Sequence, residues 1–414
     1  MNIYNLPNNY GLYKPMTPKW RDMMREHFYD IYFNNQFREK PREIYLFEPL
    51  VNMKDAIFLA GPSYRPNQPE FKKDSWRKEA IKIFRGMGFN GDFIIPEYRD
   101  KNDIPPDWTH RKQVDWEVTG LYRSHRILFW IPRDLKKLPA FTTNIEFGNF
   151  MHTNKIMVGW PNDAERNQYI QDRLDRLNIM RYEKLSEMAT DYMKYQKEPP
   201  RYYFTSDTHF GSERTRQFSL RPFVNVEQMD LEIVSNINTD LRQKDILVHL
   251  GDFGDYNAFD YLNCGKMKFF LGNYEREEEE KCREELLHKH SDKIQLIPED
   301  KNWIILTNPD NKKEKQKIYV GHEPSEVKCP KNGIAIYGHT HQRHLARLNG
   351  FDVGIDYQYR LFSEQDIWFF INVIRKKFWD KEVHTGYVGK QYEKEHTACE
   401  LEIEQFKPEI NDLE

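Results

Sequence analysis

The sequence lacks any apolar run long enough to cross a bilayer, and its N-terminus has no basic segment followed by an apolar stretch. It is also poor in cysteine, and the four cysteines are too scattered to form a zinc or redox motif. Their spacing therefore favours isolated thiols in a reducing compartment. We expect a cytoplasmic protein with no membrane association. The four cysteines are Cys264, Cys282, Cys329 and Cys399.

A strong charge of one sign is lacking as well. The 62 Lys and Arg residues nearly balance the 65 Asp and Glu residues, which leaves a formal net charge of -3. No global basic field therefore draws the chain to nucleic acid or to a membrane surface. This disfavours a nuclease, but it leaves room for a local basic cleft that binds a phosphorylated small molecule.

The length and the aromatic content predict more than one folded core. A chain of 414 residues is long for one domain, and its 27 Phe, 24 Tyr and 9 Trp can fill large cores. Two prolines, Pro199 and Pro200, end a charged helical stretch and mark the best domain boundary. We expect a first domain over residues 1–162, a helical linker over 163–200, a second domain over 201–380 and an acidic C-terminal tail over 381–414.

The first domain alternates apolar strand patterns with helical patterns. This alternation predicts an α/β fold, a doubly wound parallel sheet that binds its ligands at the carboxyl ends of the strands. Ahead of it, a helix at 17–32 and a strand at 43–47 form a candidate sheet edge or a homo-oligomer contact. Strands are expected at 56–60, 91–97, 126–132 and 155–160, and helices at 75–84, 115–124 and 142–151.

Five turns in the second half each follow an apolar run and carry a side chain that can bind a metal. Side chains alternate along a strand, so Asp207 and His209 are expected to project to the same side. One such turn is most often a capped loop, but five in one half of a chain predict a metal site. The five turns carry Asp207 and His209, then Asp252, then Asn273, then His322, and finally His339 and His341.

In this order the turns resemble the calcineurin-like metallophosphoesterase superfamily, over about residues 201–376. The resemblance implies an α/β sandwich that hydrolyses phosphomonoesters or phosphodiesters with two divalent ions, which could be Mn, Fe, Zn or Ni. It implies that Asp252 bridges the two ions. It assigns Asp207, His209 and His341 to one ion, and Asn273, His322 and His339 to the other.

One position departs from the pattern of that family. The histidine expected after Asn273, which helps to protonate the leaving group, is Tyr274. Tyrosine is a weaker acid than the imidazolium of histidine at neutral pH. We expect slow turnover, a substrate with a good leaving group, or another donor such as His249 or Arg276 in place of the motif histidine.

Two blocks of the first domain resemble the nucleoside 2-deoxyribosyltransferase family, over about residues 55–161. They are Ala-Gly61-Pro62-Ser63 and Thr-Thr143-Asn-Ile-Glu146-Phe-Gly. The resemblance implies that Glu146 attacks the anomeric carbon of a nucleoside and holds the sugar as an ester, which another base or water then releases. A helix start at Thr142 or Thr143 would keep Glu146 ionised. The competing interpretation is that Glu146 only completes a capping box with Thr143.

Other polar residues of the first domain are candidates for binding the sugar or a phosphate. Gly61 would let the backbone approach the ligand closely, and one acid would orient the sugar or protonate the leaving base. Each of these residues also has a plain structural interpretation, as a turn or a surface ion pair. The binding candidates are Gly61, Pro62, Ser63, Tyr64, Arg65, Arg77 and Thr143, and the spare acids are Glu97, Asp100, Asp115 and Glu117.

Together the two resemblances predict a bifunctional enzyme of nucleotide metabolism. The first domain would cleave or transfer the N-glycosidic bond of (deoxy)nucleosides or nucleotides, and the second would hydrolyse phosphoesters. The expected partners are small-molecule nucleosides or nucleotides. The alternative is a first domain that binds a nucleotide without cleaving it and regulates the phosphoesterase.

Overall fold

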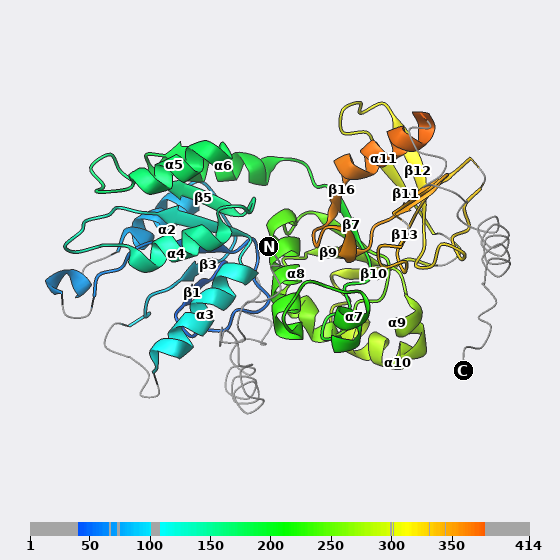
Figure 1. The fold of residues 1–414 in the computed structure, drawn as a ribbon, viewed down its shortest axis with the longest axis horizontal. Coiled ribbons are helices and arrows are strands. Elements are labelled where there is room, and N and C mark those ends of the chain that lie inside the picture. The colour runs from blue at the N-terminus through cyan, green and yellow to red at the C-terminus, as the bar shows by residue number, and fades with distance from the viewer. Residues whose placement is uncertain are drawn as a thin grey trace, which may run out of the picture. The chain divides into compact units, whose positions relative to one another are not determined.

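The structure, a computed structural model, describes residues 40–65, 68–72, 75–100, 108–298, 300, 302–330, 332–343 and 345–376. The helix expected at 17–32 and the acidic tail expected over 381–414 lie outside these residues. The chain divides into two compact units, one made of residues up to 199 together with 260–263, the other of residues 200–259 and 264 onward (Figure 1). Within the described ranges, no helix is long and apolar enough to cross a membrane.

The first unit is built on a six-stranded sheet in the order β1-β3-β2-β4-β5-β6, and every neighbouring pair is parallel. The alternating pattern of the sequence is confirmed as an α/β fold with a parallel sheet. After β2 the chain forms β3 on one side of β2 and then β4 on the other side. This reversal of direction makes β2 the switch point of the strand order. The strands are β1 (Glu43–Tyr45), β2 (Ile57–Ala60), β3 (Phe93–Ile95), β4 (Arg126–Trp130), β5 (Ile156–Gly159) and β6 (Arg181–Tyr182).

Helices cover both faces of this sheet (Figure 1). Side chains of α3, α4 and α5 form one buried cluster with one face of the sheet, and those of α2 and α6 form a second cluster with the other face. Because side chains alternate along a strand, Phe58 belongs to the first cluster and Leu59 to the second. The helices are η2 (Pro69–Lys72), α2 (Trp76–Gly86), α3 (His110–Arg123), α4 (Phe141–Phe150), α5 (Gln168–Leu177) and α6 (Leu185–Lys197).

The segment expected to be a helical linker is part of the first unit. Its helix ends at Leu177 because Asn178 takes a left-handed conformation with φ 54°, and its backbone N–H bonds back to the last turn. The chain then adds β6 to the edge of the sheet and packs α6 against α2. The expectation of a single linker helix was wrong because a polar asparagine cap, rather than a proline, interrupts the pattern.

We predict that Met188→Ala lowers the free energy of unfolding of the first unit by about 2–5 kcal/mol, since it removes a fully buried side chain of α6. Lys197→Ala, at an exposed position of the same helix, serves as the control and should change it little. Chemical denaturation of the full chain measures both. Equal stability of the Met188 variant and the wild type would mean that α6 is not part of this core.

The second unit contains two five-stranded sheets that face each other. In the sheet β10-β9-β8-β7-β16, strands β7 to β10 are parallel and β16 is antiparallel to β7. In the sheet β11-β12-β13-β15-β14, strands β12, β13 and β15 are parallel, and β11 and β14 are antiparallel edges. The strands of the first sheet are β7 (Tyr202–Thr205), β8 (Ile246–His249), β9 (Lys266–Phe269), β10 (Ile294–Leu296) and β16 (Phe362–Ser363).

Apolar side chains from both sheets and from α11 form one buried cluster between them. Phe204 and Val248 come from the first sheet, Ile318 and Ile336 from the second, and Trp368 from α11. This two-sheet sandwich agrees with the predicted fold class. The strands of the second sheet are β11 (Trp303–Thr307), β12 (Lys315–Val320), β13 (Ile334–Tyr337), β14 (Ala346–Arg347) and β15 (Gly350–Asp352).

The helices of the second unit are mostly short, and two of them begin at side-chain caps. Ser212 accepts a hydrogen bond from the backbone of Thr215, and Asn225 accepts one from Gln228. The segment from 273 to 288 is divided into three short helical pieces. The helical segments are α7 (Glu213–Phe218), α8 (Val226–Asp240), η3 (Tyr256–Tyr261), α9 (Asn273–Glu277), α10 (Glu279–Cys282), η4 (Arg283–His288), η6 (Ile355–Tyr357) and α11 (Glu364–Lys376).

Candidate functional site

All seven predicted metal ligands lie in turns that directly follow the carboxyl ends of strands. The turns after β7, β8 and β9 come from one sheet, and those after β12 and β13 come from the other. Parallel strands bring their carboxyl ends to one edge, so the five turns meet where the two sheets face each other. The ligands in chain order are Asp207, His209, Asp252, Asn273, His322, His339 and His341.

Six of the seven side chains form two groups whose nitrogen and oxygen atoms could hold a metal ion. One group is Asp207, His209 and His341, and the other is Asp252, His322 and His339. Within each group, one potential ligand atom per residue lies within 4.8 Å of the others. The grouping places residues up to 134 positions apart in the chain around one point, which sequence proximity does not explain.

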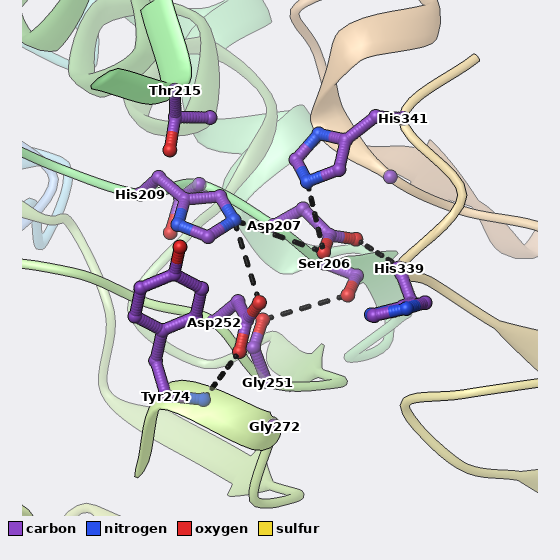
Figure 2. A network of polar contacts seen from close by, with 12 residues as sticks. Ser206, Asp207, His209, Thr215, Gly251, Asp252, Gly272, Tyr274, His339 and His341 are labelled. Carbon is purple, nitrogen blue, oxygen red and sulfur yellow. Dashed lines mark hydrogen bonds and ion pairs between the residues drawn. The ribbon is translucent and has the colours of Figure 1, made fainter. Parts of the chain in front are cut away.

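The carboxylate of Asp252 contacts both groups. Its Oδ2 lies 3.4 Å from His209 Nε2 in the first group (Figure 2). The same oxygen lies 3.4 Å from His322 Nε2 in its own group. The amide oxygen of Asn273 lies 2.9 Å from the same His322 nitrogen, and His339 Nδ1 lies 3.2 Å from it. The seventh predicted ligand therefore joins the second group.

Two buried ligand atoms have no hydrogen-bond partner among the described residues. They are Asp207 Oδ1 and His209 Nε2, which lie 4.0 Å apart on side chains at most 3% exposed. His341 Nε2 is 3.9 Å from the same Asp207 oxygen. A buried polar atom without a partner is costly, and a divalent cation between these atoms would satisfy all three. The donor set therefore fits a metal ion.

Burial and charge set the protonation of the histidines. Burial lowers the pKa of His209 to about 4, so its imidazole is neutral and has a lone pair for a metal. Burial also opposes a charge on His322, but the hydrogen bond to Asp252 and the charge of Asp207 raise its pKa to about 9. A proton and a metal ion compete for such a nitrogen.

The backbone is strained at most of the ligand positions. Asp207, His209, Asp252, His339 and His341 all have positive φ, between 44° and 72°. This left-handed region is costly for residues other than glycine, and it persists only where the surrounding structure enforces it. Clustering of such residues is typical of functional sites, so the strain supports a shared function for these turns.

Two acidic side chains that the motifs did not assign hold the ligand turns in place. Asp356 Oδ2 accepts a hydrogen bond from His341 Nδ1 at 2.6 Å, and Arg221 donates to Asp356 at 2.6 Å and to the backbone oxygen of Asp207 at 2.6 Å. The buried Glu275 accepts hydrogen bonds from the backbone N–H groups of Asp252, Phe253 and Gly272. Glu275 stands next to a predicted motif, whereas no sequence signal marks Asp356 or Arg221.

The glycine before Asn273 has a steric reason. A Cβ at Gly272 would lie 2.2 Å from Asp252 Oδ1, so only glycine lets the turn after β9 approach the Asp252 carboxylate. This explains why a glycine stands directly before a predicted ligand at this position.

Tyr274 lies beside the first ligand group. Its ring contacts the His209 ring at a centroid distance of 5.1 Å, and its backbone N–H donates to Asp252 Oδ1 at 3.1 Å. Neither expected substitute donor is available there. His249 is fully buried with its Nε2 3.0 Å from the Thr208 hydroxyl, and Arg276 forms an ion pair with Glu326 at 2.7 Å.

The first unit has a polar cluster at the carboxyl ends of β2 and β3. Arg77 is buried and donates to Gly61 O at 2.6 Å, to Ser63 Oγ at 2.9 Å and to Glu97 Oε1 at 2.8 Å. The Ser75 hydroxyl donates to the second oxygen of Glu97. Arg77 is thus committed to the fold, and the expectation that it binds a phosphate was wrong for that reason.

The glycine at position 61 is required by the protein itself. A Cβ there would lie 2.2 Å from Trp130 O and 2.8 Å from the Trp76 ring, and its φ is 154°. The expected reason, close approach of a ligand, is therefore not needed to explain this residue. Pro62 is buried and accepts a hydrogen bond from the Trp76 indole, and the Arg65 backbone N–H donates to Gln68.

Helix α4 begins earlier than its sequence suggests. Its N-cap is Ala140, with φ 58° and no side-chain cap, so Thr143 is a buried residue within the first turn. Both the expected threonine cap and the capping box with Glu146 were therefore wrong. Glu146 stands in the middle of the helix rather than at its start, so the helix dipole does not keep it ionised.

Glu146 and Glu117 repel each other electrostatically. Burial, and then the charge of Glu117 on α3, raise the pKa of Glu146 to about 7, against the opposing charge of Arg77. Burial also raises the pKa of Glu117. Of the other acids considered, Glu97 pairs with Arg77, and Asp115 lies 3.8 Å from Arg111. Of the acids that the sequence left open, Glu117 is thus the one whose charge raises the pKa of Glu146.

Comparisons with known proteins bear on the second unit. Residues 201–354 match the family model of the calcineurin-like phosphoesterase superfamily domain. An uncharacterized protein of Methanocaldococcus jannaschii is 28% identical over 152 residues, which cover 34% of this chain and 70% of the relative. A solved protein of unknown function from Aquifex aeolicus has 21% identity and a TM-score of 0.29, and the match covers 41% of this chain and 99% of that protein.

Residues 201–354 therefore form a calcineurin-like metallophosphoesterase domain, a class of metal-dependent hydrolases. The match includes all five ligand turns and both groups of potential ligands, and it ends before the last part of the unit. It supports metal-dependent phosphoester hydrolysis by this domain.

We predict that Asp356→Asn weakens the binding of a divalent ion on the order of 10- to 100-fold, because His341 loses the carboxylate that orients its ring. Titration of the metal-free protein with Mn²⁺ or Zn²⁺, followed by calorimetry, measures this. Asp292→Asn, at an exposed turn of the same unit, is the control. Unchanged affinity in the Asp356 variant would remove this residue from the metal centre.

Proposed function

We propose that the second unit hydrolyses phosphoesters with two divalent metal ions. The observation that carries this proposal is the convergence of the two ligand groups, in which Asp207 Oδ1 and His209 Nε2 are buried and have no hydrogen-bond partner among the described residues. In the proposed site, Asp252 would serve both ions because its carboxylate contacts both groups. Asp207, His209 and His341 would hold one ion, and Asn273, His322 and His339 the other.

Such ions, when bound, act as Lewis acids on a phosphate and lower the pKa of a water molecule. Their identity, Mn, Fe, Zn or Ni, is left open by the mixed nitrogen and oxygen donor set. The chain itself supplies the positions. The three backbone N–H groups that bond to Glu275 fix the Asp252 turn, and Arg221 ties the Asp207 turn to Asp356. A pre-formed site of this kind loses little order when substrate binds.

We predict that Asp252→Asn reduces phosphatase activity by orders of magnitude and lowers the metal content, because the amide has no charge to share between two cations. Elemental analysis should find two transition-metal ions per wild-type chain, and chelation should remove the activity reversibly. Asp310→Asn, in an exposed loop, is the matched control. Near-normal turnover by the Asp252 variant would contradict the bridging role.

We propose a second activity for the first unit, cleavage or transfer of the N-glycosidic bond of a (deoxy)nucleoside or nucleotide. The pair of carboxyl groups on Glu146 and Glu117 supports it, since neighbouring acids with raised pKa values suit the division of labour between a nucleophile and an acid. Their helices follow β3 and β4, which flank β2 at the switch point of the parallel sheet, where such folds bind ligands.

In this mechanism, the ionised Glu146 carboxylate forms a bond to the anomeric carbon while the bond to the base breaks. The electron pair of the broken bond stays with the base, which takes a proton from Glu117. Water or a second base then displaces the ester and restores the carboxylate. If the first unit instead binds a nucleotide and regulates the second, binding persists without release of base.

We predict that Glu146→Gln lowers base release by orders of magnitude, since the amide cannot form the glycosyl ester, and leaves phosphatase activity unchanged. Wild-type base release should rise with pH through about 7, where the pKa of Glu146 lies and its carboxylate becomes the main form. Chromatography of nucleoside and free base measures both effects. Glu79→Gln, exposed on α2, is the control.

Normal base release by the Glu146→Gln variant would show that Glu146 is not the nucleophile. Nucleoside binding by a wild type that releases no base would favour the regulatory alternative.

A further inference from the structure

A cationic side chain without an acidic partner stands beside the metal centre. Arg214, on α7, donates from Nη1 to the Tyr274 hydroxyl oxygen at 3.1 Å, and it forms no ion pair within the part of the chain that the structure describes. Three other arginines of the same unit are, by contrast, paired with carboxylates. These pairs are Arg216 with Glu213, Arg221 with Asp356, and Arg276 with Glu326.

Tyr274 connects Arg214 to both ligand groups. The Tyr274 ring packs against His209 of the first group, and its backbone N–H bonds to Asp252 of the second (Figure 2). The guanidinium is therefore one side chain away from the candidate ligands. Tyr274 is 40% exposed and Arg214 is also exposed, so a substrate that enters from solvent can reach both.

We propose that Arg214 neutralises a negatively charged leaving group, and that the site accordingly prefers phosphoanhydrides, whose leaving group is itself a phosphate, over alkyl phosphomonoesters. The inference rests on the phosphoesterase function proposed above and specifies its substrate class.

The chemistry at position 274 supports this preference. Release of an alkoxide needs a proton, and position 274 carries no histidine to supply one. When an anhydride is hydrolysed, the water oxygen forms a new bond to one phosphorus atom and the bridging P–O bond breaks. Its electron pair stays on the second phosphate, and the proton of the water passes to solvent. The leaving phosphate needs its charge neutralised rather than a proton.

The Arg214–Tyr274 pair offers the donors that such a phosphate requires. A guanidinium keeps its positive charge and presents several N–H groups in one plane, only one of which bonds to Tyr274 here. The Tyr274 hydroxyl accepts that bond and still has its own hydrogen to donate. Arginine binds phosphate oxygens in pairs, which adds orientation to charge.

The test compares two substrates whose leaving groups are similar acids but differ in charge, inorganic pyrophosphate and p-nitrophenyl phosphate. Arg214→Gln should lower kcat/KM for pyrophosphate on the order of 10- to 100-fold more than for p-nitrophenyl phosphate. Arg214→Lys, which keeps the charge, should lose less. Arg283→Gln, which removes an exposed arginine paired with Glu279 on a neighbouring helix, should leave the ratio unchanged.

A binding measurement separates this inference from the proposed function. The non-hydrolysable methylenediphosphonate should bind metal-loaded wild type more tightly than the Arg214→Gln variant. Equal losses for both substrates, together with equal binding of the diphosphonate, would overturn the role of Arg214 and leave the phosphoesterase in place. A metal-loaded wild type that hydrolyses neither substrate would overturn both proposals.

Discussion

The carboxylate of Asp252 is the contact on which the second unit's candidate centre depends. It is the point where turns from two different sheets meet, since it contacts His209 after β7 and His322 after β12. Bringing a carboxylate and several imidazoles into one buried place is costly without a cation. Two features of the fold offset this cost. Glu275 fixes the backbone around Asp252 through hydrogen bonds, and both sheets pack on one apolar core.

The candidate ligands of this centre could be picked out from the sequence because each belongs to a local pattern, an apolar strand followed by a short turn. The residues that contact and orient these candidates could not. Asp356 follows His341 by fifteen positions and Arg221 follows Asp207 by fourteen, and neither lies in a strand-turn pattern. Their role arises from how separate turns pack together, which depends on the three-dimensional arrangement of the strands.

The first unit shows the same division. Its alternation of strands and helices was sufficient to predict a parallel α/β sheet, because burial on both faces imposes apolar strands. The roles of individual side chains were harder to predict from the sequence. Arg77 suggested a phosphate ligand, yet its hydrogen bonds are used within the fold, and Glu146 suggested a helix start, yet α4 begins at Phe141 behind a left-handed Ala140. Thr142 and Thr143 look like a helix cap in the sequence, but sequence alone does not show whether the helix begins there.

The positive φ angles of the ligand residues limit which substitutions the second unit can accept. Asparagine and aspartate tolerate the left-handed region better than most residues, whereas β-branched side chains are strongly disfavoured there. At Asp207 and Asp252, replacement by asparagine therefore changes the charge with little change in backbone preference, whereas valine or isoleucine would add conformational strain to the chemical loss. Sequence variation at these turns is thus restricted by the shape of the main chain, independently of any bound ion.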